Sequence, residues 1–230
     1  MRLSYQLHRH WNATRLNLAL IDSYLDPEAQ TGLDIGSNEG VATLLLAKRG
    51  LNAKGIEARA KNRQIAEKLS HALNLTATFE DRIVSLEEVR EMDEVDVTLF
   101  LSVHHQIAAH NGLSHANDFL LSLAANTRKQ LFFQPACIKK KYRQNLPFEE
   151  NDLTGISQYF LDLLADEFPH RAVIGYSIND IPKSEPFRPM LLFSRAPIEM
   201  RKDNSSIAFL QELRKQSRSA IGFSGFVKKR

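Results

Sequence analysis

The chain has 230 residues and a net charge of +3, with 43% hydrophobic and 25% charged residues, which are ordinary values for a globular protein. They exclude a disordered chain and a collagen-like repeat, and the single cysteine, Cys137, excludes an internal disulfide and a multi-thiolate metal site. No apolar run approaches the roughly 20 residues of a membrane span, and the N-terminal residues lack the apolar core of a secretory signal. We therefore expect a cytoplasmic protein with no membrane span.

The positive charge is concentrated at the C-terminal end. Residues 201–230 hold eight Lys/Arg against two Asp/Glu, a net +6, which leaves −3 for residues 1–200. We accordingly divide the chain into a main domain, 1–200, and a basic C-terminal helix and tail, 201–230. A second basic cluster comprises Lys139, Lys140, Lys141 and Arg143. Such clusters form either a solvated face or a surface for an anionic partner or substrate.

Predicted strands alternate with predicted helices along the chain. An amphipathic helix at 7–25 comes first, and the expected strands follow at 32–35, 53–57, 76–79, 95–101, 130–133, 172–177 and 190–194. The other expected helices lie at 41–49, 61–73, 113–126, 153–168 and 206–218, with a short one opening at the capping box Ser85–Glu88. This alternation predicts an α/β fold: a Rossmann-like, mostly parallel, seven-stranded sheet with helices on both faces. The last two strands have no helix between them and predict an antiparallel hairpin at one edge.

The turn after the first strand carries the strongest chemical signal. Gly36 ends the strand and Gly40 opens the next helix, whose free N–H groups suit a bound polar group. Glu57 follows 21 residues after Gly36, at the end of the second strand, where a carboxylate can accept both hydroxyl protons of a cofactor ribose. The plainer interpretation is an ordinary strand–helix turn with a surface glutamate.

The charge of this turn separates two cofactor classes. Asp34 precedes the first glycine and Glu39 lies within the loop. Carboxylates there would repel the pyrophosphate of a dinucleotide, whereas they suit the ammonium and sulfonium of S-adenosylmethionine.

At these positions the sequence resembles the class I S-adenosylmethionine-dependent methyltransferases. The segments that carry the resemblance are Leu33–Gly40, Gly55–Ala58, Glu80–Ile83 and Val95–Ser102, and Asn38 stands where the family more commonly has a glycine. The resemblance implies a methyltransferase domain with S-adenosylmethionine as cofactor. It further implies cofactor contacts by Asp34, Gly36, Ser37, Asn38, Gly40, Glu57, Ala58, Asp81, Arg82 and Ser102.

The segment after the fourth strand narrows the resemblance. Leu101–Gly112 is similar to the methyltransferase half of the bifunctional methyltransferase/kinases that terminate O-antigen polysaccharides, as is Arg188–Met190 with the strand after it. A looser similarity is to RNA methylphosphate capping enzymes. Both families methylate a phosphate oxygen, which implies substrate binding by Lys139, Lys141 and Arg143 after the fifth strand.

Three histidines follow the fourth strand, near the expected position of the reactive methyl group. We expect His104 and His105 to face the acceptor as catalytic residues and His110 to bind substrate; core packing for His104 and a surface position for His110 are the alternatives. No carboxylate is spaced with them, so we expect no metal. A hydroxyl acceptor would need a base such as His105, whereas an anionic phosphate needs cations to position it.

The sequence thus predicts an S-adenosylmethionine-dependent O-methyltransferase whose acceptor is a glycan, a phosphate-bearing small molecule or a polysaccharide end. An RNA methyltransferase acting on phosphate or ribose is the first alternative, favoured by the basic tail and a pI of about 9.0. A catalytically silent binding partner with the same fold is the second, and the intact cofactor loop argues against it.

Overall fold

The computed structural model describes residues 6–7, 10–136, 149, 152–178, 187–201 and 205–220. The expected substrate residues Lys139, Lys141 and Arg143 lie outside these ranges, as do Cys137 and the tail from 221. The strands are β1 (Thr31–Ile35), β2 (Asn52–Ile56), β3 (Ala77–Glu80), β4 (Val95–Leu101), β5 (Thr127–Gln134), β6 (His170–Ile178) and β7 (Phe187–Ser194). The helices are α1 (Trp11–Tyr24), α2 (Val41–Lys48), α3 (Ala60–Ala72), α4 (Leu86–Arg90), α5 (His104–Asn111), α6 (Leu113–Ala125), α8 (Leu153–Leu163) and α9 (Ser205–Ala220).

The strands form one seven-stranded sheet in the order β3-β2-β1-β4-β5-β7-β6. The first five strands are parallel, and β7 runs antiparallel to both β5 and β6. The predicted fold class and the antiparallel hairpin at one edge are therefore confirmed. The strand order reverses between β1 and β4, and in open α/β sheets this is where ligands bind, beyond the carboxyl ends of the strands.

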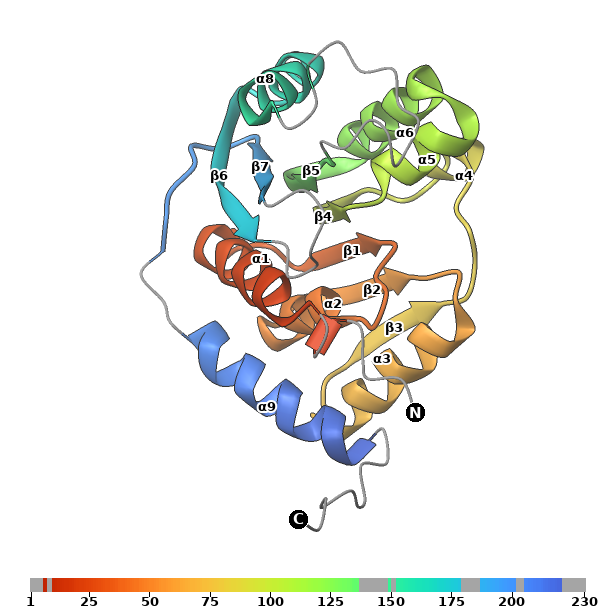
Figure 1. Cartoon of the computed structure of the whole chain (residues 1–230), viewed down its shortest axis with the longest axis vertical. Coiled ribbons are helices and arrows are strands. Elements are labelled where there is room, and N and C mark those ends of the chain that lie inside the picture. The colour runs from red at the N-terminus through yellow and green to blue at the C-terminus, as the bar shows by residue number, and fades with distance from the viewer. Residues whose placement is uncertain are drawn as a thin grey trace.

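Helices cover both faces of the sheet (Figure 1), with α1, α2, α3 and α9 on one side and α4, α5, α6 and α8 on the other. The strands supply the two cores by alternation: Leu99 and Phe132 face the first set of helices, whereas Phe100 and Phe133 face the second. Each of these four side chains is fully buried. A sheet buried on both faces explains why its strands read as nearly continuous apolar runs.

Side-chain hydrogen bonds fix the first helix to the sheet. The buried Gln130 of β5 donates to the carbonyl of Tyr24, the last residue of α1, at 2.9 Å and accepts from the Asp26 amide, two residues further on, at 2.7 Å. The C-terminal helix α9 packs on α1 and α3, burying Phe209 and Leu213 in the same core as α1. No helix among the described ranges is long and apolar enough to cross a membrane.

Local sequence signals predict some ends of helices and strands correctly and others incorrectly. The capping box at Ser85 is present, with Ser85 accepting from the Glu88 amide and Glu88 accepting from the Ser85 amide. The expected strand at 130–133 extends over Thr127–Gln134, and the expected helix at 153–168 ends at Leu163. Helix α5 was not predicted from the sequence, and it decides where the histidines point.

Candidate active site

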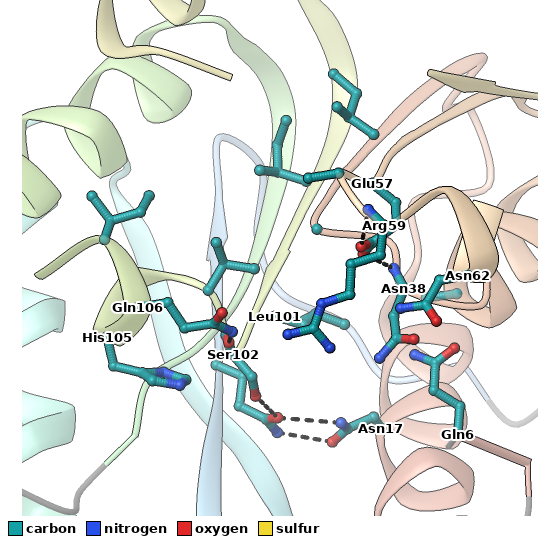
Figure 2. A pocket seen from close by; sticks show the side chains of 18 of the residues that line it. Gln6, Asn17, Asn38, Glu57, Arg59, Asn62, Leu101, Ser102, His105 and Gln106 are labelled. Carbon is teal, nitrogen blue, oxygen red and sulfur yellow. Dashed lines mark hydrogen bonds between the residues drawn. The ribbon is translucent and has the colours of Figure 1, made fainter. Parts of the chain in front are cut away.

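A cavity of about 780 Å³ lies at the carboxyl edge of the sheet, over the point where the strand order reverses. It extends from Glu57, Arg82 and Ile83, after β2 and β3, to Gln134, Ser177 and Arg188 on β5, β6 and β7. Helix α1 and the residues before it form one wall, and α5 forms the opposite one (Figure 2). Its volume suits a small-molecule ligand with room for a second reactant.

Glu57 is held at the cavity wall by backbone amides from two loops. The Asn38 amide donates to its Oε2 at 2.9 Å and the Arg59 amide to its Oε1 at 2.8 Å. Each carboxylate oxygen keeps a further lone pair for a ligand hydroxyl. Gly36, Asn38 and Ala58 also line the cavity. The structure thus brings these expected cofactor residues together around one rigidly held carboxylate.

Three other expected cofactor residues, Asp34, Ser37 and Gly40, do not line the cavity. Asp34 is 3% exposed, accepts from the Thr43 hydroxyl at 2.7 Å, and burial raises its pKa to about 7. Ser37 is buried. Gly40 has φ +74°, and a Cβ there would come within 2.5 Å of the Ala66 Cβ, so glycine is required for packing. In the structure Asp34 and Gly40 hold the loop in place by a buried hydrogen bond and by close packing, and the cofactor contacts of Asp34, Ser37 and Gly40 stay predictions.

Glu39 belongs to the loop, as expected, but it does not line the cavity. Its carboxylate is 2% exposed and accepts from the Gln6 backbone amide at 2.8 Å, and the Gln6 carbonyl accepts from the Thr14 hydroxyl at 3.0 Å. Gln6 itself lines the cavity (Figure 2). The Glu39 carboxylate therefore ties the segment before α1 to the loop, which closes that side of the cavity.

After β3 the expected pair Asp81 and Arg82 is split. Arg82 lines the cavity and donates to Glu80 and Glu88, both at 2.7 Å. The hydrogen bonds that Glu80 accepts from Arg82 and Lys54 lower its pKa. Asp81 points away from the cavity to Arg63, at 3.5 Å, so its expected adenine contact is not supported. The next residue, Ile83, is 81% exposed on the cavity wall and offers an apolar surface to a flat ring.

Ser102, directly after β4, is the meeting point of several hydrogen bonds. Its φ of +60° is uncommon for a residue with a side chain. Its carbonyl accepts from the Gln106 side chain at 2.9 Å, and its hydroxyl donates to Gln134 Oε1 at 2.9 Å. The same hydroxyl accepts from Arg188 Nη1 at 2.9 Å. Backbone strain at a ligand-facing position is common at functional sites.

His104 lies outside the cavity. It is 1% exposed, its Nε2–H donates to Asn117 Oδ1 at 3.0 Å, and its ring packs edge-on against Phe133 and Phe160. Burial lowers its pKa to about 4, so the ring is neutral near pH 7. The expected catalytic role of His104 is therefore corrected to core packing, because the helical twist of α5 turns it toward α6 and α8.

His105 does face the cavity, one helical step of about 100° around α5 from His104. It is 3% exposed and stands apart from the Ser102 network in Figure 2. His110 lies one turn or more along the same helix, is exposed at the cavity rim, and contacts the Gln106 carbonyl at 2.8 Å. No group of three potential metal ligands occurs in the described part of the chain.

Several cavity residues were missed from the sequence. Arg59 extends its guanidinium into the cavity in Figure 2, and Asn17 faces it from α1. Gln134 and Arg188 come from β5 and β7. The Arg188–Met190 segment was noted for its resemblance alone. Gln134 could have been identified as a polar residue at the carboxyl end of an otherwise apolar strand.

Comparison with solved structures gives close matches of fold. The 2.2 Å structure of WbdD shares 26% identity at a TM-score of 0.59, over 78% of this chain and 40% of WbdD, and another WbdD structure is described as a bifunctional kinase-methyltransferase. Magnesium protoporphyrin IX methyltransferase (ChlM) from Synechocystis PCC 6803 with bound SAH shares 14% identity, a TM-score of 0.56 and coverage of 80% and 84% of the two chains.

The chain has the class I methyltransferase fold. The N-terminal domain of EvdMO1 with bound SAH adds a third example, at 16% identity, a TM-score of 0.53 and coverage of 80% and 81%. The predicted resemblance to class I S-adenosylmethionine-dependent methyltransferases, and to a bifunctional methyltransferase/kinase among them, is confirmed. The chain spans about 40% of the WbdD chain. Neither protein-family models nor curated protein sequences give a match.

Proposed function

We propose that the protein is an S-adenosylmethionine-dependent O-methyltransferase. The observation that carries the proposal is the Glu57 carboxylate, held by two backbone amides on the wall of a cavity at the β1/β4 reversal. The cofactor would supply an electrophilic methyl group on a sulfonium. The ChlM and EvdMO1 structures of the same fold are described with bound SAM or SAH, which supports this choice.

The residues after β1, β2 and β3 fit such a cofactor. Glu57 would accept hydrogen bonds from two ribose hydroxyls, because each of its oxygens keeps a free lone pair. Ile83 is 81% exposed on the cavity wall, and a bound adenine would cover this apolar surface. Asn38 and Gly36 border the space between β1 and β4, where the amino-acid part of the cofactor would lie.

A ligand titration tests the cofactor. We expect calorimetry to show binding of S-adenosylmethionine and of its demethylated product, S-adenosylhomocysteine (SAH), and no binding of NAD. The physical reason is that the site offers a ribose-binding carboxylate but lacks the open Gly-x-Gly-x-x-Gly turn suited to a pyrophosphate. Binding of NAD alone would overturn the assignment, and binding of none of the three would favour a catalytically silent protein.

For the acceptor we propose a phosphate-bearing molecule, such as a phosphorylated glycan end. Among the described residues that line the cavity, Glu57 is the only carboxylate, whereas Arg59, Arg82 and Arg188 are cationic. Arg59 and Arg82 lie beside β2 and β3, and beyond that half Arg188 is the one Lys or Arg among the described lining residues, with no carboxylate beside it in the lining, so the field there favours an anion. A phosphate oxygen is nucleophilic without losing a proton, so the protein would have only to hold it in line with the methyl group.

This acceptor class predicts a small role for His105 as a base. We expect His105→Gln to lower turnover by less than about tenfold, since general-base catalysis commonly contributes about 10²–10⁴-fold and is not needed here. The ratio of variant to wild-type turnover should stay constant from pH 5.5 to 8.5. Taking the ratio removes the titration of the acceptor phosphate itself, which affects both proteins equally.

A hydroxyl acceptor would give a different result. The imidazole would then have to be neutral to accept the hydroxyl proton, so the wild-type advantage would shrink as the pH falls. A turnover loss of about 10²-fold or more at pH 8.5 that disappears at pH 5.5 would contradict the phosphate proposal. His71→Gln serves as the matched control, because His71 is exposed in the last turn of α3 and does not line the cavity.

A further inference from the structure

We infer that Asn17 binds a neutral hydroxyl group of the acceptor, with Ser177 as a second hydrogen-bond donor beside it. The inference rests on the proposed function, which assigns the β1–β3 half of the cavity to the cofactor. The half formed by β4, β5, β7 and β6 then remains for the acceptor. Asn17 projects from α1 toward that half, where it pairs with Gln134 of β5 (Figure 2).

Two reciprocal hydrogen bonds join the side-chain amides of Asn17 and Gln134. Asn17 Nδ2 donates to Gln134 Oε1 at 3.3 Å, and Gln134 Nε2 donates to Asn17 Oδ1 at 2.9 Å. A side-chain amide has two N–H donors and two lone pairs on its oxygen. The pairing therefore uses one donor and one lone pair of each residue, and it leaves one of each to be satisfied in another way.

Gln134 satisfies its remaining groups inside the protein. Its nitrogen donates to the Ser177 hydroxyl at 3.1 Å, and its oxygen accepts from the Ser102 hydroxyl at 2.9 Å. The residue is 2% exposed, so it has neither the access nor the capacity to bind a ligand. A buried side chain satisfied in this way holds its partners in one arrangement, and it therefore fixes the position of the Asn17 amide.

Asn17 differs from Gln134 in what completes its amide. Its side chain makes no hydrogen bond to any other described residue, so one N–H and one lone pair of Oδ1 remain. The Ser177 hydroxyl likewise accepts from Gln134 and gives its proton to no described residue. Both residues line the cavity. Asn17 Oδ1 and Ser177 Oγ are bonded to the same Gln134 nitrogen, so one small ligand can reach both side chains.

The remaining groups of Asn17 select a hydroxyl over an anionic oxygen. A phosphate oxygen only accepts hydrogen bonds, so beside Asn17 Oδ1 it would face a second acceptor with no proton between the two. A hydroxyl suits every remaining group, because it can donate to Asn17 Oδ1 and can also accept from the Asn17 N–H or the Ser177 O–H. Asn17 is therefore a specificity-determining residue, and the acceptor carries a hydroxyl beside its reacting phosphate.

The test compares glycerol 3-phosphate with n-propyl phosphate, which has the same carbon chain and lacks the two hydroxyl groups. Each is titrated by calorimetry into protein saturated with SAH. We expect the wild type to bind glycerol 3-phosphate about 5–50-fold more tightly, the effect of two or three neutral hydrogen bonds. Asn17→Leu should reduce this preference to less than about twofold, and Ser177→Ala, which removes one donor, should retain part of it.

The preference between the two ligands is the informative quantity, because a merely structural effect of Asn17 would change both affinities alike. Asn52→Leu, at the exposed start of β2, is the matched control and should keep the wild-type preference.

The outcomes separate this inference from the proposed function. Absence of SAH binding by the wild type would defeat the proposed function, and this inference with it. Three results with normal SAH binding would overturn the inference and leave the cofactor assignment standing: no preference for glycerol 3-phosphate in the wild type, a wild-type preference retained in Asn17→Leu, or no binding of either phosphate at 20 mM.

Discussion

Replacing Glu57 by alanine should weaken SAH binding by about 1.5–3 kcal/mol, which is roughly 10–150-fold at 25 °C. This is the range for hydrogen bonds to a charged group, and the carboxylate would make two of them to the ribose. Glu57 also accepts from the amides of Asn38 and Arg59, so its removal loosens the two loops that border the ribose position. Both effects act in the same direction on affinity.

Calorimetry with SAH measures the change, and thermal unfolding of the ligand-free protein checks that the variant is folded. Glu87→Ala is the matched control, because Glu87 is an exposed glutamate in the first turn of α4 and does not line the cavity. An affinity within twofold of wild type in Glu57→Ala would show that the ribose does not lie at Glu57, and the cofactor half would then have to be placed elsewhere in the cavity.

The parts of the fold that depend on local pattern were predictable from the sequence. Short, nearly continuous apolar runs such as Val95–Leu101, separated by predicted helices, indicated a mostly parallel sheet. A parallel strand is buried on both faces and must therefore be apolar on both. The spacing of Gly36 and Glu57 also indicated that both residues lie at the same edge of the sheet, because they follow neighbouring parallel strands.

Other residues were misplaced because the spacing of residues in the sequence does not reveal the direction in which each side chain leaves its helix or loop. His104 and His105 are adjacent, yet α5 directs one to the core and the other to the cavity. Asp81 and Arg82 separate in the same way after β3. Asn17, Gln134 and Arg188 lie far apart in the chain, so their shared network exists only through the tertiary structure.

The buried Asp34 predicts a pH-dependent stability that Asp34→Asn should abolish. Burial raises the pKa of Asp34 from 3.8 to about 7, and the nearby Glu57 charge adds a smaller increase. The bond from Thr43 acts in the opposite direction but does not offset the burial. The folded protein therefore retains this proton over a pH range in which the unfolded chain has lost it.

The direction of this pH dependence follows from the difference in proton binding between the folded and unfolded states. Below about pH 4 both states are protonated, and the contribution of Asp34 to stability is fully present; it is lost as the pH rises toward and through 7, where the folded state also ionises. The loss over this range is up to about 4 kcal/mol, from a pKa difference of about three units. An asparagine is neutral in both states, and its oxygen can still accept from Thr43, so the variant should lack this loss.

Urea unfolding of wild type and Asp34→Asn at several pH values from 4.5 to 8.5 measures the difference directly. We expect the free energy of unfolding of the variant, relative to wild type, to rise by up to about 4 kcal/mol across this range. Comparing the two proteins at each pH cancels the titration of all other groups. Asp93→Asn, at an exposed position, should show no such rise. A wild-type-to-variant difference that is constant with pH would mean that Asp34 ionises in the folded protein as it does in the unfolded chain, and that the loop rests on a charged carboxylate.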